Sequence, residues 1–85
     1  MNFNEFKQDF KQGTSVLMKD GKVVAVLSSL DKLKQAIEED MEATIKGIAY
    51  CRTFDYGYKG EVAVKVEQDG ETYENIFELY NTTLY

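Results

Sequence analysis

Residues 61–77 read EVAVKVEQDGETYENIF, and this stretch decides the fold. Valines at every second position from residue 62 to 66 are typical of a β-strand with one buried face. Asp69-Gly70 follows, and Asp-Gly between two β-rich runs predicts a two-residue hairpin turn, because such turns need positive φ at both central residues. The sequence therefore predicts an antiparallel hairpin here.

This turn also predicts which residues face each other across the hairpin. The predicted pairs are Val66 with Tyr73, Val64 with Asn75, Val62 with Phe77 and, on the opposite face, Lys65 with Glu74. Residues 73–80 also fit helical spacing, through Tyr73, Ile76, Phe77 and Tyr80. We favour the strand because the turn and the cross-strand partners agree with each other.

A second Asp-Gly, at residues 20–21, separates the runs 14–19 and 22–27 and predicts another hairpin. Pairing across it places Met18 opposite Val23 and Val16 opposite Ala25. Both faces of this hairpin are apolar, so we expect it to lie centrally in the sheet, covered on two sides.

Two segments have helical periodicity. Phe3, Phe6 and Phe10 line one face of a predicted helix near residues 4–12, with Asn2 or Asn4 as its cap and Gly13 after its end. The second helix follows a Ser28-Ser29 cap, with Asp31 in a capping-box-like position, and ends at Gly47. Its apolar stripe consists of Leu30, Leu33, Ile37, Met41 and Ile45.

Residues 48–54 alternate as in a strand, with helix continuation to about Tyr50 as the alternative, and residues 55–60 form a loop. The predicted order is α-β-β-α-β-β-β. The fold class is therefore α+β: a single small domain over residues 1–85, with a mainly antiparallel sheet and one or two helices packed on it.

Composition points to an intracellular protein. The chain has 85 residues, 13% aromatic residues and one cysteine, so it has no internal disulfide of the kind that small secreted domains use. Polar residues follow Met1 directly, and no apolar run approaches the roughly 20 residues of a membrane span. We expect a cytoplasmic protein with no membrane partner.

Catalytic residues are scarce. The chain has no histidine, which removes the commonest general base and a common metal ligand. Cys51 is interpreted as a small buried hydrophobe, although Arg52 beside it is the kind of neighbour that activates a thiol. No calcium loop or phosphate loop is present. We therefore expect no enzyme activity, no catalytic or metal-binding residues and no cofactor.

Gly57-Tyr58-Lys59-Gly60 resembles the GXXG loop of KH domains, which implies contact with an RNA backbone. A KH loop joins two helices and has basic side chains to help it. Here the segment lies between two predicted strands in an acidic half of the chain. We therefore expect no direct binding of nucleic acid.

Acidic residues and tyrosines gather in the C-terminal part. Residues 53–85 carry seven acidic and two basic side chains, whereas residues 1–52 are neutral overall. All six tyrosines lie in residues 50–85, and tyrosine is enriched in binding surfaces. Solubility alone is the simpler explanation of the charge, and packing over the sheet edge is the alternative explanation of the rings.

These features predict a small acidic protein-binding module whose partner has a basic surface. The predicted contacts are Asp55, Tyr56, Tyr58, Glu61, Glu71, Glu74 and Glu78. The sharpest version is an inhibitor from a phage or mobile element that presents carboxylates in place of phosphates to a host protein, such as a defence nuclease. The alternative is a homo-oligomeric assembly protein, such as a homodimer, that pairs strand edges at residues 48–54 or 73–80. A small-ligand sensor is a third class.

Overall fold

The computed structural model describes residues 2–82. Its longest hairpin joins β4 (Lys59–Gln68) to β5 (Glu71–Asn81), with Asp69 and Gly70 at φ 53° and 80° in the turn. Ten antiparallel pairs form without any shift of register. All four predicted pairs, from Val62 with Phe77 to Val66 with Tyr73, are confirmed, so the helical alternative for residues 73–80 is wrong.

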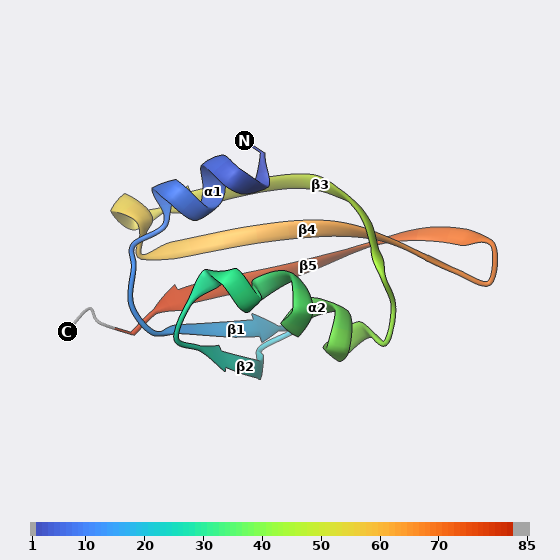
Figure 1. Ribbon diagram of the computed structural model, residues 1–85, viewed down its shortest axis with the longest axis horizontal. Helices are drawn as coiled ribbons and strands as arrows, with labels where there is room; N and C mark the ends of the chain where they lie inside the picture. The colour runs from blue at the N-terminus through green and yellow to red at the C-terminus, as the bar shows by residue number, and fades with distance from the viewer. Residues whose placement is uncertain (1, 83–85) are drawn as a thin grey trace.

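Three more strands complete the sheet: β1 (Ser15–Lys19), β2 (Lys22–Leu27) and β3 (Ile45–Phe54). The order across the sheet is β2-β1-β5-β4-β3, and every neighbouring pair is antiparallel (Figure 1). The strand β5 therefore lies in the middle, between β1 and β4. The element order α-β-β-α-β-β-β agrees with the prediction.

Both helices lie on one face of the sheet, which gives a single compact α+β domain (Figure 1). They are α1 (Phe3–Asp9) and α2 (Leu33–Met41), and a 3₁₀ turn, η1 (Leu30–Lys32), precedes α2. One apolar core lies between the helices and the sheet. Its fully buried large side chains include Phe6 and Phe10, Leu33 and Ile37 of α2, and Phe77 and Leu79 of β5.

The Asn2 side chain caps α1 by accepting a hydrogen bond from the Glu5 backbone N–H at 2.8 Å. The helix ends at Asp9, about one turn before the predicted end, and Phe10 is already extended. Phe10 still reaches the core, with its ring centroid 5.6 Å from that of Phe6. The predicted phenylalanine stripe therefore does form a core face.

The prediction that the first hairpin is central is wrong. The strand β2 is an edge strand, and its Val23 and Val26 are more than 60% exposed. Met18 does pair with Val23, but Val16 pairs with Val26 instead of Ala25. A β-bulge at Val24 inserts one extra residue and shifts the register beyond it.

The second helix also ends earlier than predicted, at Met41 instead of Gly47. Glu42 adopts the left-handed conformation at φ 53°, and its N–H bonds the carbonyls of Glu38 and Glu39. The Glu38 carboxylate then accepts the Ile45 N–H at 2.9 Å, and Ile45 enters β3 opposite Val66. The predicted Ser29 cap is present, but it caps η1 instead of α2: its hydroxyl accepts the Asp31 N–H at 3.2 Å.

Residues 48–54 belong to β3, so helix continuation to Tyr50 is wrong. A tight turn, η2 (Asp55–Gly57), connects β3 to β4, and all three of its residues have positive φ. The Gly57 carbonyl accepts the Lys11 N–H at 2.8 Å, which ties this turn to the segment after α1. A side chain at Gly57 would lie 2.5 Å from the Asp9 carbonyl oxygen, so only glycine fits here.

Candidate functional site

The sheet has a second face that neither helix covers. Register places alternate side chains of all five strands on this uncovered face, from Val26 of β2 through Val16, Tyr80 and Lys59 to Phe54 of β3. Among the described residues, six large hydrophobic side chains are exposed. Four of them lie on this face: Val23, Val26, Phe54 and Ile76.

Two carboxylates lie side by side on the uncovered face, because Glu61 of β4 pairs with Glu78 of β5. Glu61 accepts hydrogen bonds from the Tyr50 hydroxyl at 2.8 Å and from Arg52 Nη2 at 2.7 Å. The Arg52 guanidinium in turn lies 5.2 and 5.3 Å from the ring centroids of Tyr50 and Phe54. Glu61 is thus held in a fixed position on the sheet.

These contacts alter proton affinities. The hydrogen bond from Tyr50, followed by Arg52, lowers the pKa of Glu61 against the opposing effect of partial burial. The same bond raises the pKa of Tyr50. On the neighbouring strand, the Tyr80 hydroxyl donates to Glu78, which raises the pKa of Tyr80. Both carboxylates therefore accept side-chain hydrogen bonds, and the bonds to Glu61 favour its charged form.

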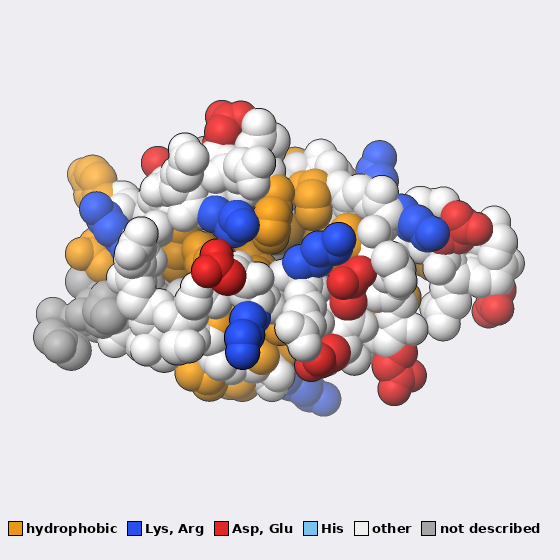
Figure 2. Space-filling view, viewed as in Figure 1, with side chains coloured by type: hydrophobic (Ala, Val, Ile, Leu, Met, Phe, Trp, Pro, Cys, Tyr) orange, Lys and Arg blue, Asp and Glu red, His pale blue; other side chains and the backbone are white. Residues whose placement is uncertain are grey.

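The β4–β5 hairpin extends beyond the rest of the sheet as an arm, which we define as residues 67–74 (Figure 1). Strand β3 begins opposite Val66, and β1 ends its pairing opposite Glu78, so the arm has only two strands. It is exposed and carries four acidic side chains and no basic one: Glu67, Asp69, Glu71 and Glu74. Figure 2 shows acidic side chains at its tip.

The structure separates the predicted contact residues into two groups. Asp55, Glu61 and Glu78 line one shallow hollow of about 300 Å³ together with Phe54 and Lys59. Glu71 and Glu74 belong to the arm, and Glu71 lies seven residues from Glu78, on the order of 23 Å along an extended strand. The predicted set is therefore two surfaces at opposite ends of one hairpin.

The two predicted loop tyrosines differ in their environment. Tyr56 is 94% exposed and projects from η2, where Asp55 and Tyr56 both have left-handed φ. Tyr58 is half-buried, and its carbonyl accepts the Asn81 N–H at 2.8 Å. Tyr56 is thus available for contact, whereas Tyr58 helps to fix the end of β5.

Sequence reasoning missed the apolar part of the uncovered face and two of the four arm acids, Glu67 and Asp69. The signal for Glu67 was present, because Lys65 was already assigned to the face opposite the valines and Glu67 shares its alternation. Val23 and Val26 had no such signal, since their exposure follows from the position of β2 at the edge.

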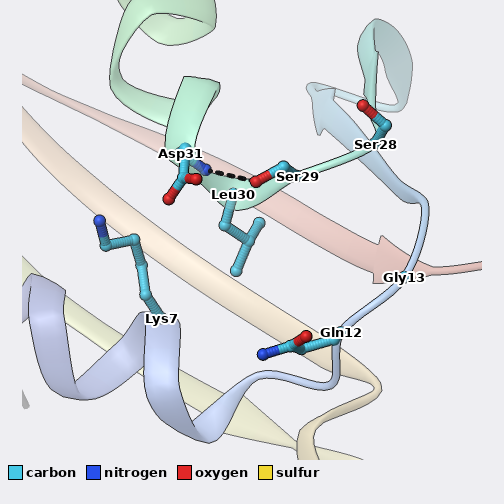
Figure 3. Close-up of a pocket in the computed structure, with 7 residues that line it drawn as sticks. All are labelled: Lys7, Gln12, Gly13, Ser28, Ser29, Leu30 and Asp31. Atoms are coloured by element: carbon cyan, nitrogen blue, oxygen red, sulfur yellow. Dashed lines mark hydrogen bonds between the residues drawn. The ribbon is translucent and has the colours of Figure 1, made fainter.

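A furrow runs between the helices on the other side of the molecule. Figure 2 shows apolar side chains in it with basic side chains beside them. At one end, a hollow of about 410 Å³ receives Lys7 and Gln12 from one side and Asp31 from the other (Figure 3). At the other end, Phe3 and Ile48 line a second hollow with Lys34 and Lys46. The lysines that line these two hollows outnumber the single acidic side chain, Asp31, in contrast to the arm.

Other chemistry is limited in the part of the chain that the structure describes. Burial raises the pKa of the Cys51 thiol, whose residue is 2% exposed, so the thiol keeps its proton at neutral pH. Within residues 2–82, no cluster of three or more His, Cys, Asp or Glu side chains is arranged to hold a metal ion. No helix in that range has the length and apolar character needed to cross a membrane.

Comparison of this chain with protein-family models, with curated proteins and with solved structures finds no match.

Proposed function

We propose that this chain is a small protein-binding module that places its acidic arm and the adjoining uncovered sheet face against a basic surface of another protein. The proposal rests on the acidic arm. Residues 67–74 contain no basic side chain, Lys65 pairs with Glu74 at the base of the arm, and Glu67, Asp69, Glu71 and Glu74 are all exposed. A projecting element with one sign of charge attracts and orients a partner of the opposite sign.

The sharper form of the proposal is an inhibitor, of phage or mobile-element origin, that occupies a nucleic-acid-binding surface of a host protein such as a defence nuclease. Such surfaces attract phosphates through clustered lysines and arginines. The arm supports this because its carboxylates lie on both faces of a two-stranded ribbon, with Glu67 and Glu74 on one side and Glu71 on the other. A cationic channel would meet negative charge on each wall.

The pairing of Glu61 with Glu78 also supports a binding role. Like charges directly opposite each other on neighbouring strands destabilise a sheet, and here the ion pair of Arg52 with Glu61 offsets one of the two charges. Exposed aromatic and apolar side chains, including Phe54 and Ile76, adjoin the pair. A surface of this mixture is typical of protein contact sites.

The test is capture of partners from cell lysate by the tagged protein, with low-salt and high-salt washes and identification by mass spectrometry. The arm variant Glu71→Lys/Glu74→Lys reverses two charges, and the matched control Glu5→Lys/Glu39→Lys makes the same change on the helices. We expect a nucleic-acid-handling protein at low salt that is lost at high salt and lost in the arm variant only. Retention of that partner by a folded arm variant contradicts the proposal.

Self-association is the second candidate, and the exposed Val23, Val26, Phe54 and Ile76 on the uncovered face favour it. Two copies would pack these faces together as in a sandwich. Sedimentation at high micromolar concentration then gives a dimer that persists in high salt, because apolar contacts are not screened. A monomer under those conditions removes this candidate.

A further inference from the structure

The middle strand β5 has a free edge along part of its length. Pairing with β1 covers only Glu78 to Asn81, whereas pairing with β4 covers the whole strand. The backbone of β5 alternates direction: the Asn81 N–H donates toward β4, to Tyr58, and the Thr82 N–H donates toward β1, to Thr14. By this alternation the backbone groups of Thr72, Glu74 and Ile76 point to the side that β1 leaves empty.

This free edge differs from the two outer edges of the sheet. The strand β2 contains a bulge, and β3 has two irregularities in its register, next to Gly47 and Tyr50. Bulges at an edge discourage pairing with another chain. The β5 segment has none, since its ten pairs with β4 are regular. It is the edge best suited to accept a new strand.

A hollow of about 400 Å³ adjoins this edge, between the end of α2 and the β4–β5 hairpin. Val66, Tyr73 and Asn75 lie on the helix side of the hairpin, and Glu74 and Lys19 in the lining bring the hollow to the free edge of β5. Met41, Val66 and Tyr73 supply apolar contacts in it. An extended chain placed there would find both hydrogen-bonding groups and a surface for alternate side chains.

The charges around the hollow favour a basic occupant. Asp40 and Glu74 line it, with Lys19 as the only basic side chain among its lining residues. A second copy of the chain fits poorly, because antiparallel self-pairing centred on Glu74 would set that carboxylate against its own copy. The strand to be added is therefore expected to carry lysine or arginine.

We propose that an extended basic segment of a partner protein adds to the sheet along Thr72, Glu74 and Ile76 of β5, in line with β1. This strand addition rests on the proposed function, because it supplies the way in which the module holds a basic partner. Main-chain hydrogen bonds provide affinity in this mode, and alternate side chains provide selectivity.

Amide hydrogen exchange tests the proposal directly. The probe is a short synthetic peptide of alternating lysine and valine, and its glutamate–valine counterpart is the control. We expect the lysine peptide to slow exchange at Thr72, Glu74 and Ile76, and to leave the β2 and β3 edges unchanged. Absence of binding, or binding that leaves these three amides unprotected, overturns strand addition.

A proline variant tests the same edge by affinity. Proline has no backbone N–H. The N–H that Ile76→Pro removes faces away from β4, so the hydrogen bonds between β4 and β5 are kept. Ile76→Thr removes the same apolar side chain and keeps the N–H. We expect the proline variant to bind the lysine peptide about tenfold more weakly than the threonine variant, since it loses a backbone hydrogen bond and gains a blocking ring. Equal affinities overturn the proposal.

The two proposals fail in different ways. Capture that depends on salt and on Glu71 and Glu74, without protection of the three β5 amides, overturns strand addition and leaves the acidic module in place. Capture that depends neither on salt nor on Glu71 and Glu74, together with protection of the three β5 amides, contradicts the electrostatic function. It leaves strand addition along β5 in place. If Ile76→Pro does not fold, the exchange pattern of the unaltered protein decides alone.

Discussion

At Gly60 the sheet packs so closely against α1 that residue 60 has no room for a side chain. A Cβ atom there would lie 2.7 Å from two ring atoms of Phe6 and 3.1 Å from the ring of Phe10. Both rings are fully enclosed in the core, so neither can move aside cheaply. The absence of a side chain at residue 60 thus allows the phenylalanine stripe to reach the sheet.

We expect Gly60→Ala to lower the free energy of unfolding by about 1–3 kcal/mol, as overpacking of a core does. Gly47→Ala is the matched control, because nothing lies within 4 Å of a Cβ at that position. Its expected change is within about 0.5 kcal/mol. Urea unfolding of both variants measures the difference, and equal stabilities would show that α1 moves away from the sheet.

Glu61 makes stability depend on acid pH. Tyr50 and Arg52 lower its folded-state pKa below the ordinary value of 4.5. As pH falls through the interval below 4.5, the unfolded chain binds a proton before the folded one does, so stability decreases. The contribution is fully present above that interval and is lost once pH passes the lowered pKa.

Glu61→Gln is therefore expected to flatten the decline of stability below pH 4.5, measured by urea unfolding across an acid pH series. Glu67→Gln, which removes a carboxylate from the exposed arm, is the comparison. An unchanged slope in Glu61→Gln would mean that the hydrogen bonds to this carboxylate are not kept in solution.

At the scale of elements, the arm is separable from the fold. Beyond Val66 and Tyr73 the hairpin has no third strand and buries no core residue. A two-stranded hairpin contributes little stability of its own. Replacing residues 67–72 by Asn-Gly keeps a two-residue turn between the same strands.

We expect this shortened chain to keep its fold, with the free energy of unfolding changed by about 1 kcal/mol or less. It should lose capture of a basic partner. Circular dichroism and urea unfolding check the fold, and the low-salt capture experiment checks binding. Capture at the original level would place the binding surface elsewhere, on the uncovered face or in the furrow between the helices.

Helices and strands could be predicted from the sequence where a local rule determined their pairing or their ends. The Asp69-Gly70 turn sets the register of β4 against β5, because a two-residue turn leaves no choice of partners. The end of α2 was not predictable in this way. Ile45 needs burial whether it continues a helix or begins a strand, so the apolar spacing continued past the true end at Met41.

Bulges were the other source of error, because one extra residue leaves no mark in a pattern of alternation. Val24 shifts β2 against β1, and a shift at Ala49 places Ile48 and Tyr50 on opposite faces, although simple alternation predicts the same face for both. The carboxylate pair follows from the hairpin register, whereas the arginine beside it and the uncovered face required the β3–β4 register and the strand order. The acidic arm needed only the hairpin.

For the whole molecule, we expect hydrogen exchange to show a gradient of stability along β4 and β5. Their central segments lie in the middle of the sheet, and Val62, Val64 and Phe77 are fully buried. The arm has two strands and full exposure. Native-state exchange should be slowest at amides paired between the central segments and fastest in residues 67–72. Uniform protection along the hairpin would contradict an independent arm.

The position of β5 also constrains when the protein can acquire its fold during synthesis. Ser15 pairs with Asn81, and β1 touches β4 only through β5. While the ribosome is still adding residues 71–81, the first hairpin and the β3–β4 pair have no common neighbour. The finished sheet must therefore assemble after translation has passed Asn81, and until then the nascent chain exposes apolar strands that chaperones bind.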